Sequence, residues 1–517
     1  MTKEEISAGM ALLEKYRAGK QALESRIVEN EQWWKLRHRP AEGESVSAWL
    51  FNCLMNKHAD AMDNYPRPIV LPREKGDSED AKMLSAILPL VLEENGFEET
   101  YDRCWWQKLK NGTGCYGVFW DSGKQNGLGD IAIRRIDLLN LFWEPGVNDL
   151  QQSPHLFHVE LWDNTALRSA FPVLKDAPLG QSGFTVSRYL YDDTVDTSDK
   201  TPVIDWYTRE EIGGRTVVHF AKIAAGVCLY DSREQAETAE RGYYDHGLYP
   251  FVTDVLFPEE GSPAGFGYVD VLKSAQTYTD TLNNIILRNA VMTGRKRFFL
   301  RQDGSVNEAE FADWGRDFVH VAGSLDEESI REITVSPLDS FVMAALSGKV
   351  EEMKETAGNR DFSQGGTAGG VTAASAISAL QEAGNKLTRD MIKASYRAFS
   401  AVCRLCVELI RQFYTEGRYF RILGEDGETD FVSYDNRRIR EDRFCRAPVF
   451  DLRILSEKSS PFTRMTQNEM AKEFYALGFF DPARADAALL CLDMMDFEGR
   501  EQLKSRIRAG REVMANE

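Results

Sequence analysis

The residues with the clearest potential for chemistry lie in a glycine-rich stretch, DFSQGGTAGGVTAASAISALQEAG, at 361–384. A glycine-rich loop before a helix can bind phosphate, because the first N–H groups of the helix point at the anion. The stretch lacks the Gly-Lys-Ser/Thr of a Walker A loop, and no lysine or arginine lies between Phe362 and Leu380. An enzyme with a phosphate-binding loop remains an alternative, but the loop would have no nearby cation to balance the charge of the phosphate. Thr372 is the expected N-cap of a helix that starts at Ala373.

A second glycine cluster, NGTGCYG, satisfies the pattern G-x-G-x-x-G with Gly112, Gly114 and Gly117. The dinucleotide-binding version of this pattern follows a strand and opens a helix. Here a helical pattern precedes the glycines and the strand-like VFWD follows them. The order is inverted, so the sequence predicts a helix-to-strand turn that uses the freedom of glycine at positive φ.

Histidine and cysteine spacing favours structural roles. No H-E-x-x-H, zinc spacing, G-x-S-x-G elbow or paired carboxylates can be found, so we expect no catalytic residue, no metal and no cofactor. His155 and His158 flank a β-like stretch, where a spacing of three puts side chains on opposite faces. Cys403 and Cys406 form a C-x-x-C inside a helical pattern and are expected to be core thiols. The other histidines are His38, His58, His219, His246 and His320.

The charge of the chain limits its partners. Lys and Arg number 62 and Asp and Glu 81, which gives a net charge of −19. A protein that grips DNA by its phosphates usually has a basic face, so only a local basic patch is compatible with this composition. The tightest such cluster in the middle of the chain is Arg295, Lys296 and Arg297, which fits either a solvated helix end or a ring of charge that faces a partner or DNA. No signal-peptide pattern and no run of 18 apolar residues are present, so we expect no membrane association.

Hydrophobic periodicity predicts an α+β chain with several regions. Helices are expected over 1–40, 44–64 and 77–110, followed by a mixed, mostly antiparallel β region over 116–257. A strong helix is expected from Pro263 to Gly294, with Val271, Tyr278 and Ile285 among its apolar positions, and a second from about Pro337 with Phe341 and Met353. A very long helix is expected over 373–414, strands over 418–455, and helices over 463–517 that end in a basic helix. The tryptophan pairs 33–34 and 105–106 are expected mainly to pack in the core.

The order of these parts resembles the portal proteins of tailed bacteriophages. GFGYVDVLKSAQTYTDTLNNIILRNAVMTGRKRFFL resembles the first stem helix of that family leading into its clip. DLLNLFWEPGVNDLQQSPHLFHVELWD resembles a strand region of its wing, and GGTAGGVTAASAISALQEAGNKLTRDMI its tunnel loop running into a long wing helix. The resemblance extends from about residue 30 to the end and depends on the order of the parts rather than on one signature motif.

The resemblance implies a portal-type ring subunit with long stem helices, a mixed β wing, a small α/β clip and a helical C-terminal crown. The implied divisions are 1–262 for the N-terminal helices and α+β wing, 263–294 for the first stem helix, 295–336 for the clip, 337–358 for the second stem helix, 359–372 for the tunnel loop, 373–462 for the long wing helix and returning strands, and 463–517 for the crown.

The implied function is a ring, a dodecamer in this family, at one vertex of the capsid in the virion. It would be the channel for packaging and ejection of double-stranded DNA, with assembly in the host cytoplasm. The implied partners are the terminase large subunit, head–tail adaptor proteins, and capsid and scaffold proteins. The clip would dock motor and adaptor through Arg295, Lys296, Arg297 and Arg301. The residues implied to face DNA in the channel are Ser363, Gln364, Gly365, Gly366, Thr367, Ala368, Gly369 and Gly370.

Small uncharged loop residues fit such a channel, because each lysine on a ring would be multiplied by the subunit number and phosphate contacts add steeply. The subunit itself is expected to be non-enzymatic, and the isolated chain to be marginally stable or prone to assemble. A structural ring or scaffold unrelated to DNA transit is the other alternative.

Overall fold

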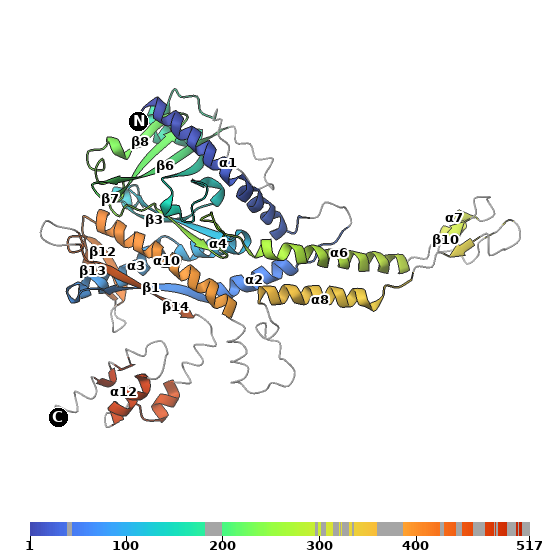
Figure 1. The fold of residues 1–517 in the computed structure, drawn as a ribbon. Coiled ribbons are helices and arrows are strands. Elements are labelled where there is room, and N and C mark those ends of the chain that lie inside the picture. The colour runs from blue at the N-terminus through green and yellow to red at the C-terminus, as the bar shows by residue number, and fades with distance from the viewer. Residues whose placement is uncertain are drawn as a thin grey trace. The chain divides into compact units, whose positions relative to one another are not determined.

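The computed structural model in Figure 1 describes residues 1–38, 44–180, 199–294, 298–300, 307–313, 320, 322, 330–332, 336–358, 386–423, 429–440, 447–458, 471–479, 481, 484–493, 503–504 and 506–508. Contacts divide the chain into two compact units. The first comprises Met1–Met62 and Pro68–Leu455, and the second Asp63–Arg67 and Ser456–Glu517.

Two antiparallel sheets form the centre of the first unit, which confirms the predicted antiparallel β region. The larger sheet has the order β4-β5-β6-β7-β8, and the smaller the order β3-β2-β9. The strands of the larger sheet are β4 (Leu141–Trp143), β5 (His155–Asp163), β6 (Lys200–Ile212), β7 (Arg215–Ala224) and β8 (Val227–Asp231). Those of the smaller sheet are β2 (Thr113–Asp121), β3 (Asp130–Arg135) and β9 (Phe251–Val255).

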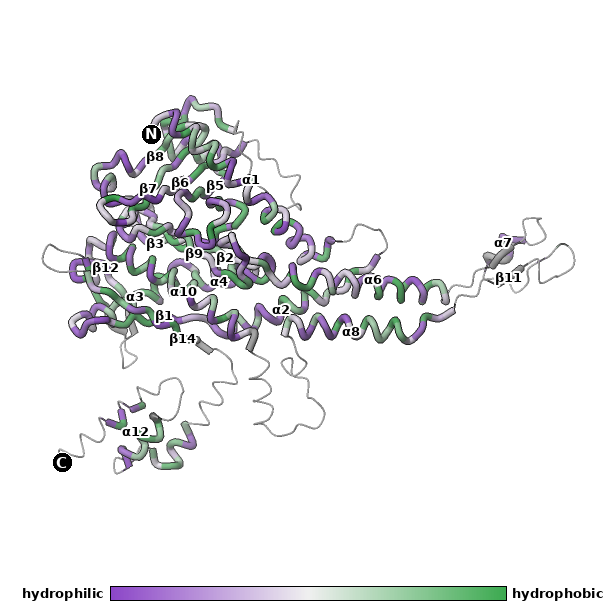
Figure 2. The backbone as a smooth tube through the Cα atoms, in the orientation of Figure 1, coloured by the Kyte–Doolittle hydropathy of each residue, from purple (hydrophilic) through white to green (hydrophobic). Residues whose placement is uncertain are grey.

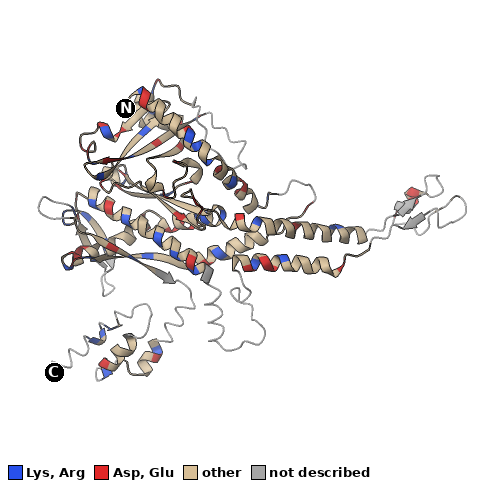
Figure 3. Cartoon of the chain, in the orientation of Figure 1, with Lys and Arg blue, Asp and Glu red and all other residues tan. Residues whose placement is uncertain are grey.

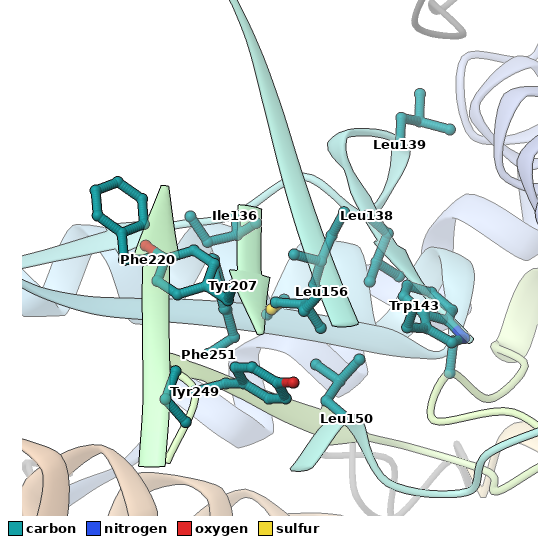
Figure 4. Close-up of a cluster of buried hydrophobic side chains, with 14 of the residues drawn as sticks. Ile136, Leu138, Leu139, Trp143, Leu150, Leu156, Tyr207, Phe220, Tyr249 and Phe251 are labelled. Carbon is teal, nitrogen blue, oxygen red and sulfur yellow. The ribbon is translucent and has the colours of Figure 1, made fainter. Parts of the chain in front are cut away.

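A hydrophobic core lies between these sheets, as Figure 4 shows. Leu156, Tyr207 and Phe220 come from three strands of the larger sheet and meet Phe251 of the smaller one. Side chains alternate along a strand, so the neighbouring residues point to the opposite face of the sheet. The larger sheet therefore needs a second cover, and α1 provides it.

Helix α1 (Lys3–Trp34) packs Leu13 and Tyr16 on this opposite face of the larger sheet. The helix comes so close that a Cβ on Gly9 would lie 2.5 Å from the Trp206 ring, so glycine is needed there. The predicted helix over 1–40 was too long. The chain leaves the helical conformation at Leu36, where φ is 56°.

The predicted helix over 77–110 is wrong as a single element. It is two helices, α3 (Ser78–Glu94) and α4 (Phe97–Asn111), because Gly96 adopts the left-handed conformation with φ 57°. Pro89 lies inside α3 and does not divide that helix. Helix α2 (Trp49–Met62) starts later than predicted, because residues 44–48 are not helical.

Two further helices, α6 (Tyr268–Gly294) and α8 (Ser340–Ala357), lie side by side. Between them in sequence are β10 (Phe298–Leu300), α7 (Glu308–Ala312) and β11 (Ile330–Glu332), and the two strands pair antiparallel. The long helix predicted over 373–414 is described as α10 (Lys386–Phe413), and its first residues lie outside the described part of the chain. The strands after α10 are β12 (Arg418–Leu423), β13 (Thr429–Tyr434) and β14 (Phe450–Lys458), of which β14 pairs with β1 (Asn64–Pro72).

The second unit has a small helical core of its own. Its helix α12 (Ala485–Asp493) packs Ala488 and Leu492 against Phe474 and Ile507. Of the predicted basic helix, Lys504, Arg506 and Arg508 are described, and all three are helical. Among the helices that the structure describes, none is long and apolar enough to cross a membrane.

Candidate functional site

Helices α6 and α8 form an antiparallel pair, which we call the stem hairpin. The amide of Asn289 near the end of α6 donates to the carbonyl of Ser336 just before α8, at 3.2 Å. Towards the other end, the hydroxyl of Thr279 lies 3.8 Å from the sulfur of Met353. The first contact joins the end of α6 to the start of α8, and the second joins an earlier residue of α6 to a later residue of α8, so the two helices run antiparallel.

A ladder of polar side chains fixes α6 to residues 44–50, which we call the strap. Gln276, Asp280 and Asn284 are four residues apart and therefore share one helix face. Each accepts a backbone N–H of the strap at 2.9 Å: that of Leu50, Ser47 and Ser45 respectively. Arg288, another four residues on, forms an ion pair with Glu44 at 3.0 Å. The ladder thus satisfies backbone groups of a segment that forms no sheet of its own.

Asp280 is the central residue of this ladder and has no exposed surface. Burial alone would raise the pKa of this carboxyl group. Hydrogen bonds from His38, Ser47 and Gln276 outweigh that effect and lower the pKa of Asp280. The site therefore holds a carboxylate, which acts as a fixed anchor between the strap and the helix. The sequence carries a signal for this anchor that was missed above, since polar residues recur at every fourth position of the helix.

The opposite side of α6 carries exposed apolar side chains. Val271, Tyr278, Ile285 and Met292 recur every seven residues and are 39%, 59%, 44% and 46% exposed. We call these four residues the stem stripe. From Thr281 to Gly294 the only charged residue is Arg288, and Figures 2 and 3 show how few charges interrupt the apolar positions of the hairpin beyond its base.

Helix α8 adds to this apolar surface. Phe341 is 74% exposed and Met343 is 53% exposed. Phe341 and Met353 were predicted to share one apolar face of this helix, and of the two only Met353 is buried. Exposed apolar side chains that recur on two neighbouring helices form a candidate interaction surface.

Both ends of the glycine-rich segment are held at α2. Gly358, with φ 68°, caps α8 after the buried residues Met353 and Ala357. At the beginning of α10, the ammonium group of the buried Lys57 of α2 donates to the Thr388 hydroxyl at 2.9 Å. The helices on either side of the glycine-rich segment, α8 and α10, therefore both contact α2.

The predicted site residues themselves lie outside the described residues. This holds for Ser363, Gln364, Gly365, Gly366, Thr367, Ala368, Gly369 and Gly370, and for Arg295, Lys296, Arg297 and Arg301. The structure therefore places the helices that flank these residues and not the residues themselves, so both sets stay predictions.

The other motifs have structural roles in the described chain. Gly112, with φ 86°, ends α4 and leads directly into β2, which confirms the predicted helix-to-strand turn. Cys403 and Cys406 are buried in α10, as predicted. Of the tryptophans, Trp105 is fully buried, whereas Trp33 stacks on His38 at 3.8 Å and Trp106 on His58 at the same distance. Among the residues that the structure describes, no cluster of His, Cys, Asp or Glu could hold a metal ion.

The described chain thus combines a stem hairpin that carries exposed apolar side chains with a β-rich body. Residues 262–517, which contain α6, α8 and α10, match the model of the phage P22-like portal protein family. This match confirms the resemblance to the portal proteins of tailed bacteriophages and supports a phage portal role for the chain. No curated protein matches the chain.

Proposed function

We propose that the chain is the subunit of a closed ring at one vertex of the capsid, through which double-stranded DNA is packaged and ejected. The observation that carries this proposal is the match to the portal family over the stem hairpin and the long helix α10. The exposed stem stripe supports it, because a ring subunit must bury such a surface against a neighbouring copy.

The glycine-rich segment is proposed to approach the DNA in the channel. Its residues 363–370 carry no charge. A moving duplex needs a close neighbour that does not bind it, and neutral side chains avoid the additive contacts that lysines would make with phosphates. The anchoring of α8 and α10 on α2 supports this role, since it gives the segment two fixed ends.

The helix that precedes this segment presents carboxylates. Glu351 and Glu355 are exposed on α8, and the chain as a whole has a net charge of −19. Carboxylates beside a channel would repel phosphates and would discourage DNA from adhering to the wall. A wall of this kind guides DNA without gripping it.

The clip, residues 295–336, is proposed to dock the terminase motor and the head–tail adaptors. Its basic cluster of Arg295, Lys296, Arg297 and Arg301 would give each ring a circle of positive charge for an acidic partner. Capsid and scaffold proteins would contact the ring during assembly in the host cytoplasm. A structural ring without DNA transit remains the alternative, and a phosphate-binding enzyme is the weaker one.

The copy number of the chain in phage particles tests the proposal. A ring at a single vertex contributes about a dozen copies per particle, whereas a protein that repeats over the capsid or the tail contributes many more. Quantitative mass spectrometry of purified particles, calibrated with labelled peptides, measures this number. Hundreds of copies, or none, would contradict the proposed role.

A further inference from the structure

A second apolar surface lies on the other side of the stem base, at α2. The Trp34 ring stacks on Phe51 at 4.6 Å between centroids and lies 5.0 Å from the Trp106 ring. All three side chains are half-buried, and Met55 beside them in α2 is 42% exposed. We call these four residues the aromatic patch. Its side chains adjoin one another, unlike the single apolar residues that are common on protein surfaces. Two of them are tryptophans, which are enriched among the residues that contribute most to binding energy at interfaces.

The stem stripe and the aromatic patch face in different directions. At 100° per residue, Tyr278 and Ile285 point roughly 140–160° away from Asp280, the centre of the ladder that binds the strap. The strap leads into α2, so the stripe faces away from that helix. On α2, Leu54 and Ala61 are buried, whereas Met55 lies on the exposed face.

We propose that the aromatic patch of one subunit receives the stem stripe of the neighbouring copy of this chain. The inference rests on the proposed ring and assigns its contact surfaces. A ring of identical chains needs two different surfaces on each subunit, one for each neighbour. The stripe is a narrow, uncharged ridge on a helix, and the patch is an aromatic surface with the adaptable side chain of Met55 at its edge.

A second copy fits these surfaces better than DNA or a charged partner does. The nearby cations have partners of their own: the ammonium group of Lys349 on α8 lies over the Tyr278 ring at 5.8 Å and 2.6 Å from Glu352, and Lys273 pairs with Glu29. Small polar residues such as Ser274 and Thr281 also lie between the apolar members of the stripe. Such residues let a partner surface approach closely. The side chains of the stripe and of the patch are apolar or aromatic, so contact between the two surfaces removes apolar area from water on both.

Photo-cross-linking of the full chain tests this pairing directly. Tyr278 is replaced by p-benzoylphenylalanine, the assembled protein is irradiated, and cross-linked peptides are identified by mass spectrometry. The expected products join residue 278 to peptides that contain Trp34, Met55 or Trp106 of a neighbouring chain. The matched control places the same photoreactive residue at Phe431, which is 70% exposed on β13 and belongs to neither surface. It should give no cross-link to the patch.

The substitution Met55→Lys provides a second readout. This substitution puts an unpaired charge into the proposed contact, so we expect the protein concentration at half-assembly to rise at least tenfold. The control is Val173→Lys, at a residue that is 65% exposed and belongs to neither surface, and it should leave that concentration unchanged. An unchanged melting temperature of the Met55→Lys chain would show that folding is intact.

The outcomes separate this inference from the proposed function. Rings that form normally but cross-link residue 278 to other regions, or that tolerate Met55→Lys, would overturn the pairing and leave the portal role intact. A wild-type chain that forms no ring would overturn both.

Discussion

Lys108 is a buried cation whose partners come from distant parts of the sequence. Its ammonium group lies 2.7 Å from Asp254 on β9 and 2.7 Å from the hydroxyl of Ser395 on α10. Burial lowers the pKa of Lys108, and the neighbouring Asp254 carboxylate opposes that shift. The residue thus connects α4, the smaller sheet and the long helix in one polar contact.

Removing this cation should destabilise the fold strongly. Lys108→Met leaves Asp254 buried without a counter-charge, which costs about 3–5 kcal/mol. Thermal or urea unfolding of the purified chain measures the loss. Lys273→Met, which removes a partly exposed ion pair with Glu29, is the matched control and should cost less than about 1 kcal/mol. Equal costs for the two variants would contradict this role of Lys108.

His246 should make the stability depend on pH. Burial lowers the pKa of this imidazole to about 4, and its Nδ1 accepts the Leu248 N–H at 3.0 Å, which requires the neutral form. The unfolded chain has the higher pKa and binds the proton first. The contribution of the neutral ring is therefore complete above about pH 6.5 and is lost as the pH falls towards 4.

The variant His246→Gln isolates this effect. It cannot titrate, so its melting temperature should fall less than that of the wild type between pH 6.5 and pH 4.5. Parallel curves for the two proteins over this range would show that His246 is not buried in its neutral form.

The ladder on α6 is the main device at the scale of elements. Three side chains at helical spacing bind three backbone N–H groups of the strap. We therefore expect the ladder to affect the hydrogen exchange of these N–H groups more than it affects the free energy of unfolding of the whole chain. The reason is that the strap has no strand partner of its own.

Hydrogen exchange tests this dependence. Asn284→Ala removes the acceptor of the Ser45 N–H, and we expect the strap amides to exchange at least tenfold faster. Thr281→Ala, on the exposed side of the same helix, is the control and should leave their exchange unchanged. If the exchange of the strap does not respond to Asn284→Ala, the ladder does not hold it.

The elements show which parts of the fold the sequence could predict. The turn at Gly112 follows from a local pattern and agrees with the structure. The division between α3 and α4 depends on one left-handed residue, Gly96, inside a continuous helical pattern. The ladder could not be derived from periodicity alone, because Asp280 and Ser47 are 233 residues apart in sequence.

At the scale of the whole molecule, exposed apolar surface and acidic charge are consistent with assembly around a channel. The apolar positions of α6 were predicted from the sequence. Which of them remain exposed depends on where the strap and α8 pack, and this could be seen only in the structure. The predicted loop and clip residues lie outside the described part of the chain, so their roles rest on the sequence and on the family match.

Charge in the glycine-rich segment should impede DNA transit. Gly366→Lys adds one cation per subunit, and a ring multiplies it into a circle that binds phosphates. We expect heads with this variant to package DNA several-fold more slowly, with partial recovery at high salt. Gly366→Ser, which adds a neutral side chain, is the control. Equal packaging rates for both variants would place the segment away from the DNA.

Electron microscopy of the purified full chain tests the central claim most directly. The account predicts closed rings of about a dozen subunits with an axial hole of roughly 20 Å or more, wide enough for a duplex. Particles without a hole, or a stable monomer at every concentration, would contradict it.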